Sequence, residues 1–227
     1  MVVAVLPLEA KSNSVLLLTS EMKQGESRVT LHGLSWLSYQ QILNAIPESH
    51  SVRLTYDRGT LEITMPLAIH EFFLRLIERF IIILVVEMGL KVKTMGSTTM
   101  SHEALKRGAE PDCAYYIQNQ PKVVGKVTID FIQDPPPDLV VEVDITHTDI
   151  DKNSLYASMG VPEFWRYDGT YLYIYHLQQD KYVECDRSPT FDWVEKENLY
   201  CFLRESQQDE VAAEIKFRAF VKEKLRT

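Results

Sequence analysis

The sequence predicts an α+β fold (α/β mixed), in which a central mixed β-sheet is flanked by helices within one domain. Two observations predict it. Short segments of alternating apolar and polar residues, typical of strands, occur along most of the chain. Two longer segments, 68–88 and 207–226, instead carry apolar residues at helical spacing. No internal repeat or low-complexity tract interrupts these patterns.

In the first half of the chain, a short helix is predicted over 34–46. Residues 52–65 alternate on both sides of a two-residue turn, which predicts a β-hairpin. The long helix over 68–88 follows, and Gly89 supplies its stop. Further short strands are predicted over 91–94, 98–101 and 112–117.

In the second half, the polar segment 118–130 is predicted to be an excursion from the sheet. Pro135–Pro137 then leads stiffly into a strand over 138–144, because three fixed φ angles leave little freedom. Asp168–Gly169 is a strong two-residue hairpin signal. The other predicted elements are a helix over 151–159, strands over 163–167, 170–176 and 181–185, and the helix over 207–226.

The predicted organisation has three parts. Residues 1–30 show no clear period and are predicted to form an N-terminal arm, and 31–204 form the main domain. The segment 205–227 is predicted to be a C-terminal helix that packs on the domain or on a partner subunit. A homodimer is therefore expected.

The composition is that of an ordinary soluble globular protein, with 45% hydrophobic and 25% charged residues. The net charge of −8 argues against a protein that coats nucleic acid, because phosphate binding depends on Lys and Arg, but it does not exclude a nuclease. The longest apolar run, Phe80–Val86, is far shorter than the roughly 20 residues of a membrane span. The three widely spaced cysteines match neither a zinc site nor a disulfide framework, so a cytoplasmic location is expected: Cys113, Cys185 and Cys201.

Acidic residues mark the strand predicted over 138–144. Asp138, Glu142 and Asp144 share one face of this strand, because side chains alternate. An ionised carboxylate on an apolar strand is costly to desolvate unless it is paired or binds a metal. A further acid lies upstream, in the segment Glu110–Pro111–Asp112. Two separated acids of this kind suggest a metal-dependent hydrolase.

The residue types for such chemistry are present. A hard divalent cation such as Mg²⁺ binds a few carboxylate oxygens and keeps several waters. It polarises a phosphoryl oxygen and makes a bound water nucleophilic, and a nearby lysine can neutralise the developing charge. Asp112, Glu142 and Lys152 supply these groups, with Glu71 as a candidate third acid.

Several sequence blocks follow one another in a distinctive order: Glu110–Asp112, Pro136–Val143, Lys152 with Tyr156, and Gly160–Trp165. In this order and spacing they resemble the Uma-type restriction endonucleases of bacteria. That family belongs to the PD-(D/E)XK, or restriction-endonuclease-like, superfamily. The resemblance extends over residues 36–185 and implies a restriction-endonuclease-like core. It also implies DNA as the substrate, with Mg²⁺ or Mn²⁺ as the cofactor.

Carried over residue by residue, the resemblance implies that Asp112 and Glu142 hold the metal, together with Glu71 at the start of the long helix. The superfamily's usual lysine, two residues after the strand acid, is replaced by Asp144. The resemblance implies that Lys152 on the following helix takes over the role of that lysine. Asp144 could add a metal ligand, cap the next turn or mark a lost activity.

Each candidate also has a structural explanation. Glu142 could be a buried acid paired with Arg166. Asp112 could serve the turn that follows Pro111, and Glu71 could favour the start of a helix through the helix dipole. Lys152 could be a solvated helix residue.

The neighbouring residues have simpler interpretations. Asp138 is expected to cap the entry to its strand, and Tyr156 to belong to the core. His70 is expected to lie on the surface, and His147 to be a polar loop residue.

The sequence thus predicts a Mg²⁺-dependent endodeoxyribonuclease. The main alternative is a catalytically degenerate protein that keeps the nuclease fold to bind nucleic acid or protein, as Asp144 and the net charge of −8 suggest. A hydrolase of another phosphoester and a dimeric scaffold are weaker alternatives.

Overall fold

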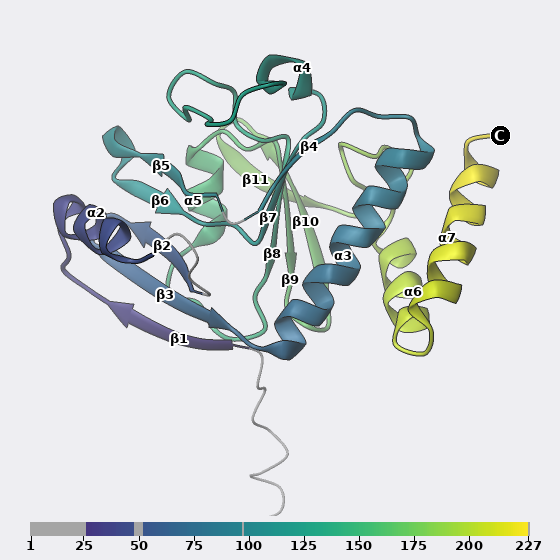
Figure 1. The fold of residues 1–227 in the computed structure, drawn as a ribbon, viewed down its shortest axis with the longest axis horizontal. Helices are drawn as coiled ribbons and strands as arrows, with labels where there is room; N and C mark the ends of the chain where they lie inside the picture. Colours follow the sequence, from purple (N-terminus) through teal and green to yellow (C-terminus); the bar gives the residue numbers. More distant parts are fainter. Residues whose placement is uncertain (1–25, 48–51, 97, 227) are drawn as a thin grey trace, which may run out of the picture.

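The computed structural model describes residues 26–47, 52–96 and 98–226 (Figure 1). It confirms the predicted α+β class, with helices packed on mixed and antiparallel sheets. The described strands form two sheets rather than one. Among the described residues, no helix is both long and apolar enough to span a membrane.

The first sheet is antiparallel and holds the described strands in the order β1-β3-β2-β6-β5. The predicted hairpin joins β2 to β3, and its turn residues Arg58 and Gly59 have φ values of 45° and 109°. Two consecutive positive φ values are typical of the tight turns that match the twist of a hairpin. The strands are β1 (Glu26–Leu31), β2 (Arg53–Asp57), β3 (Thr60–Pro66), β5 (Met100–His102) and β6 (Arg107–Ala109).

The second sheet is mixed, and its described strands run in the order β11-β10-β9-β8-β7-β4. Strands β8 and β9 are parallel, and the short helix α5 (Lys152–Ser158) lies in the crossover between them. The strands are β4 (Lys93–Met95), β7 (Cys113–Tyr116), β8 (Leu139–Val143), β9 (Glu163–Tyr167), β10 (Leu172–Gln178) and β11 (Lys181–Cys185).

Helices cover both sheets. The long helix α3 (Ala68–Glu87) crosses the second sheet, and α6 (Lys196–Ser206) and α7 (Glu210–Lys224) pack beside it (Figure 1). On the first sheet, α2 (Trp36–Ala45) buries Trp36 and Tyr39 against apolar residues of β2 and β3. Two shorter helices complete the described elements: η1 (Glu103–Leu105) and α4 (Gln120–Val123).

Strand β8 separates two apolar cores, as its alternation predicts. Leu139, Val141 and Val143 enter the core beneath α3. Val140 enters a second core, which α5 helps to close. Because side chains alternate along a strand, Glu142 lies on the same side as Val140. Glu142 therefore lies on the side of β8 where α5 packs and not in the core beneath α3.

The N-terminal arm predicted over 1–30 is only partly within the described residues. Residues 26–30 belong to β1, which pairs with β3, so this part of the arm is a strand of the first sheet. Residues 1–25 lie outside the described residues. The pairing of β1 depends on partners at least 30 residues away in sequence, so it cannot be predicted from the local pattern.

The helix predicted at the end of the chain packs on its own domain. Phe217 of α7 stacks on Phe80 of α3, with ring centroids 4.4 Å apart. Val211 and Ile215 of the same helix are exposed instead of buried. Helix α6 was not predicted, although Leu199 and Phe202 of its buried face stand at helical spacing.

Candidate active site

Three buried acids and a lysine converge where β8 ends and α5 begins. Lys152, the first residue of α5, places its Nζ 3.0 Å from Glu142 Oε2 and 2.7 Å from Asp144 Oδ1. Asp112 precedes β7, the antiparallel neighbour of β8, and its Oδ2 accepts a hydrogen bond of 2.8 Å from the Val143 N–H. The fold therefore gathers Asp112, Glu142 and Lys152 at one place.

Lys152 is buried and stays protonated. Burial alone would lower the pKa of Lys152, but the charges of Asp144 and Glu142 raise it above its ordinary value. The Asp151 side chain accepts from the Ser154 N–H at 3.1 Å and thereby caps the helix that carries the lysine. Lys152 is therefore a fixed, buried cation rather than a solvated helix residue.

Glu142 is the acid of this group that holds a proton most readily. Burial raises its pKa to about 7, and the charges of Asp112 and Asp144 act in the same direction. Lys152 and a short hydrogen bond from the Tyr156 hydroxyl oppose this shift. The lysine cannot cancel it, because Lys152 is shared with Asp144. Glu142 thus titrates near neutral pH.

Asp112 is held as an anion. Burial alone would raise its pKa, but the hydrogen bond and charge of His70, the charge of Lys152 and the Val143 N–H together lower it. His70 Nε2 lies 3.0 Å from Asp112 Oδ2, and Arg53 Nε lies 3.4 Å from Oδ1. These contacts fix the carboxylate from both sides.

The expectation that His70 lies on the surface is wrong. Its side chain is 1% exposed, because the helical face that carries it packs into the domain. The signal was present in the sequence: His70, Phe73, Leu74 and Ile77 recur at helical spacing. His70 and Arg53 both contact Asp112, and the sequence analysis included neither among its candidate site residues.

Three cationic side chains contact Asp144. Its Oδ1 lies 3.2 Å from Arg28 Nη2 as well as 2.7 Å from Lys152 Nζ, and its Oδ2 lies 3.5 Å from Arg166 Nε. Burial alone would raise the pKa of Asp144, but these charges lower it. The alternative pairing of Glu142 with Arg166 is not observed, since Arg166 faces Asp144. The acid at the place of the superfamily's lysine therefore holds other cations in position.

Glu71 lies at the rim of this group. Its side chain is 38% exposed and pairs with Arg75 at 3.2 Å. Arg53 lies 4.0 Å from Glu71, and His70 Nδ1 lies 3.7 Å from it. Both side chains also contact Asp112. Glu71 is thus linked to the centre through two intermediaries.

Asp138 directly precedes β8 and lies at the opposite end of the strand. Its carboxylate accepts from the N–H groups of Ile117 at 2.7 Å and Asn119 at 2.8 Å. It therefore caps the strand entry, as the sequence predicts. His147 is 87% exposed on the loop after β8 and pairs with Asp149 at 3.3 Å.

The described residues provide two carboxylates for a cation rather than a full cage. Among them, no three His, Cys, Asp or Glu side chains are grouped to hold a metal. Asp112 and Glu142 nevertheless belong to the same group, since Asp112 accepts from the N–H of Val143, the residue after Glu142. Mg²⁺ is commonly held by one or two carboxylates and keeps the rest of its shell as water. Asp112 and Glu142 supply the type of donor that such an ion takes.

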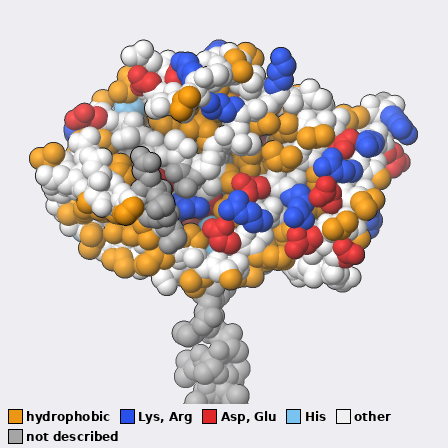
Figure 2. Space-filling view, in the orientation of Figure 1, with side chains coloured by type: hydrophobic (Ala, Val, Ile, Leu, Met, Phe, Trp, Pro, Cys, Tyr) orange, Lys and Arg blue, Asp and Glu red, His pale blue; other side chains and the backbone are white. Residues whose placement is uncertain are grey.

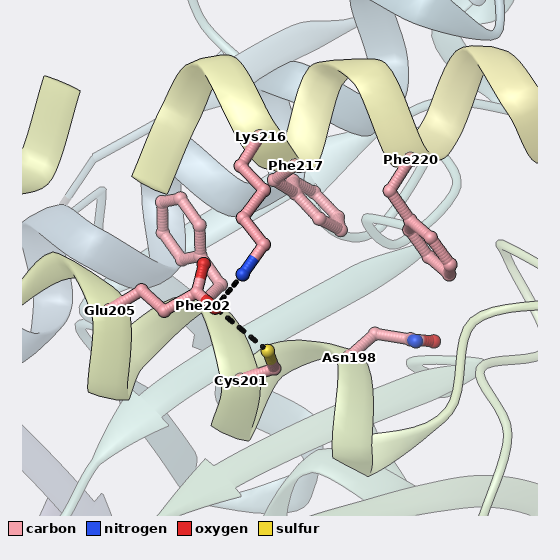
Figure 3. A pocket seen from close by; sticks show the side chains of 7 residues that line it. All are labelled: Asn198, Cys201, Phe202, Glu205, Lys216, Phe217 and Phe220. Atoms are coloured by element: carbon pink, nitrogen blue, oxygen red, sulfur yellow. Dashed lines mark hydrogen bonds and ion pairs between the residues drawn. The ribbon is translucent and has the colours of Figure 1, made fainter. Parts of the chain in front are cut away.

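A separate apolar cavity of about 140 Å³ lies between α6 and α7, away from these acids (Figure 3). Phe202, Phe217 and Phe220 form much of its wall, and Lys216 points to Glu205 at its edge. It contains none of the acids or the lysine described above. The chemistry of the fold is therefore concentrated at the junction of β8 and α5.

Comparison with known proteins shows which family model matches this chain and which solved structure resembles its fold. Residues 36–202, most of the chain, match the family model Uma2, described as "Putative restriction endonuclease". A solved structure, described as a putative nuclease belonging to DUF820 from Anabaena variabilis ATCC 29413, is similar with a TM-score of 0.52 and 15% identity. The similarity covers 74% of this chain and 97% of that one, and it shows a shared fold. A search of curated proteins finds no match.

Proposed function

This chain belongs to the Uma2 restriction-endonuclease family, and from that premise we propose that it hydrolyses phosphodiester bonds of DNA with the help of bound Mg²⁺. The observation that carries the proposal is the convergence of Asp112, Glu142 and Lys152. Two acids that can hold a divalent cation and one lysine beside them are the groups that such a hydrolysis needs.

Asp112 and Glu142 would hold the metal. When bound, Mg²⁺ polarises a phosphoryl oxygen and lowers the pKa of a bound water. His70 and the Val143 N–H keep Asp112 ionised and oriented for this task. Tyr156 orients Glu142 through its hydroxyl group.

Lys152 would stabilise the negative charge that develops on the phosphate. It is suited to this role because it is buried and its pKa is raised, so it carries a full charge in surroundings of low dielectric constant. Asp144 acts as the positioning residue, since it holds the ammonium group at 2.7 Å. Without metal, burial raises the pKa of Glu142 to about 7, so Glu142 would give up the proton that it carries at low pH when Mg²⁺ binds.

The overall surface does not attract DNA by its net charge. Figure 2 shows basic and acidic side chains side by side over α3 and α7. Several of them are paired, such as Arg79 with Glu210 and Arg218 with Glu87. Binding of DNA must therefore depend on local groups near the site.

A plasmid-nicking assay with added Mg²⁺ tests the proposal. We expect Asp112→Asn and Glu142→Gln to abolish the cleavage seen with the native chain, and a chelator to do the same. The matched controls are Asp192→Asn and Glu197→Gln, which change exposed acids elsewhere. Full cleavage by either site variant in a clean preparation would rule out the proposed mechanism.

A degenerate binding protein is the second candidate, favoured by Asp144 at the place of the superfamily's lysine. Calorimetric titration with Mg²⁺ separates the two functions. A functional centre should bind the ion in the native chain and lose binding in Asp112→Asn. The homodimer stays a prediction, which sedimentation velocity can test.

A further inference from the structure

A polar hollow of about 410 Å³ opens beside Lys152, between the loop after β8 and the start of α5. Lys152 and Arg166 of β9 both line it. His147, Asp149 and Asp151 contribute to the rim. The hollow therefore connects the buried lysine of the candidate active site with the surface.

The loop that forms this hollow is fixed by a buried acid from the other sheet. Glu62 of β3 is 0% exposed and accepts from Thr148 Oγ1 at 2.8 Å and from the Ile150 N–H at 3.0 Å. Arg28 Nη1 pairs with the same carboxylate at 2.7 Å. The wall is thus built in advance of any ligand, which lowers the entropy cost of binding.

The acids at the rim are already engaged. Asp149 pairs with His147 at 3.3 Å, and Asp151 accepts from the Ser154 N–H at 3.1 Å. Asp144, which lies below Arg166, is buried and paired with Lys152. Each of these acids therefore already has a partner within the protein.

The guanidinium group of Arg166, in contrast, still has hydrogen-bond donors that can bind a ligand. Its side chain is 32% exposed, and its Nε is 3.5 Å from Asp144 Oδ2. Neither of these two buried atoms forms a hydrogen bond with the described residues. Asp144 thus holds the guanidinium group in place by charge without saturating its five donors. A planar group of donors in this state suits a phosphate, which arginine can bind with two parallel hydrogen bonds.

We propose that this hollow binds a phosphate of the DNA strand next to the one that is cleaved, with Arg166 as its ligand. The inference rests on the proposed function. Lys152 serves the reacting phosphate, and Arg166 serves its neighbour along the strand. Asp144 orients both cations.

Binding can be measured apart from cleavage. Fluorescence anisotropy with a labelled DNA duplex, in a chelator and over a range of salt concentrations, gives Kd for the full chain. We expect Arg166→Ala to raise Kd about tenfold and to lower the slope of log Kd against log salt by about 1, as for the loss of one phosphate contact. Arg166→Lys should recover part of the loss.

Arg187→Ala is the matched control. Arg187 is also paired with an acid, Glu195, at 2.6 Å, but it is 65% exposed and does not line the hollow. Its replacement should leave both Kd and the salt slope unchanged. An equal loss in Arg187→Ala would mean that any surface arginine contributes as much, and this would overturn the inference.

Steady-state kinetics show whether Arg166 binds a phosphate of the DNA or only supports Lys152. Arg166→Ala should raise KM while kcat changes little, whereas Lys152→Met should lower kcat. If Arg166→Ala lowers kcat with KM and Kd unchanged, Arg166 acts through Asp144, and the hollow is not a phosphate site.

The two proposals can fail separately. If the native chain cleaves DNA and Arg166→Ala binds it equally well, the inference fails and the proposed function stands. If the native chain binds without cleaving and Arg166→Ala binds more weakly, the phosphate site stands and the hydrolysis fails. A native chain that shows no binding overturns both.

Discussion

Buried acids lie at both ends of the parallel strand pair β8–β9, but the groups that contact them differ in charge. At the starting end, Leu139 of β8 is in register with Glu163 of β9, and Asp138 lies next to them. At the other end, Glu142 is in register with Arg166, and Asp144 follows. Both ends hold buried carboxylates in similar surroundings, but the groups that contact them differ.

Neutral groups satisfy the acids of the starting end. Glu163 accepts from Ser188 Oγ and the Thr190 N–H at 2.7 Å each, and from Trp165 Nε1 at 2.5 Å. Asp138 accepts from backbone N–H groups, as described above. Such donors are fixed by the fold and cannot be displaced without breaking it. These acids are therefore structural.

Cations hold the acids of the other end. Asp144 is held by Arg28, Lys152 and Arg166, and Glu142 shares Lys152 with it. Long charged side chains can move to another anion, and an acid that they hold can exchange them for a metal. The difference teaches that the partners of a buried acid, more than the acid itself, indicate where a substrate can bind.

Lys152→Met should have the largest effect on function. Loss of the charge that faces the reacting phosphate should lower kcat by about 10²- to 10³-fold. Lys196→Met is the matched control, because Lys196 also lies between two acids, Glu184 at 2.7 Å and Asp186 at 3.6 Å. Single-turnover cleavage by the two variants measures the difference. Equal cleavage rates for the two variants would contradict the proposed role of Lys152.

Glu163→Ala should lower the stability of the protein and leave its cleavage activity unchanged. It leaves buried donors of Ser188, Thr190 and Trp165 without their acceptor, which should lower the free energy of unfolding by about 3 kcal/mol. Urea unfolding measures this loss. The activity per folded molecule should stay at the native level, and a selective loss of cleavage would place Glu163 in the catalytic machinery.

The pH dependence of stability should differ in sign between Glu163 at the starting end and Asp144 at the other end. Burial raises the pKa of Glu163 more than its neutral donors lower it, so its contribution to stability is lost as pH rises through the folded-state pKa. The pKa of Asp144 is lowered by its cations against the effect of burial, so its contribution is lost as pH falls.

Urea unfolding tests this difference above about pH 4.5 for Glu163, whose pKa is raised, and below about pH 4 for Asp144, whose pKa is lowered. Relative to the native chain, Glu163→Gln should remove a slope that favours low pH. Asp144→Asn should remove one that favours high pH. Slopes of the same sign would contradict the comparison.

Glu71→Gln should have the smallest effect. Because Glu71 reaches Asp112 through Arg53 and His70, its loss should weaken Mg²⁺ binding about tenfold, as for a residue that supports a metal ligand. Calorimetry compares it with Asp112→Asn, for which we expect no measurable binding. If both variants lose binding completely, Glu71 is itself a ligand.

Much of the resemblance to the nuclease family came from the structural end. The block Gly160–Trp165 contains Glu163, whose partners are neutral and whose role is to tie β9 to the segment after β11. The blocks around Asp112 and Glu142 supplied the centre itself. A family pattern thus combines residues of both kinds, and contacts in the structure are needed to separate them.

The sequence by itself determined the local features. Alternation with a period of two fixed which side of β8 carries Glu142 and Asp144, and helical spacing predicted α3. The residue types limited the chemistry to acids and a lysine. These are properties of a chain segment and its immediate neighbours, and so they can be predicted from a single sequence.

The tertiary structure alone decided which partner each acid has. Asp144 meets Arg28 across 116 positions of the chain, and Asp112 meets His70 across 42. Such contacts depend on how β1 and α3 pack against the rest of the fold, so they cannot be predicted from the local sequence pattern. For this reason the sequence could identify the acids, but only the packed chain separated those held by neutral donors from those held by cations.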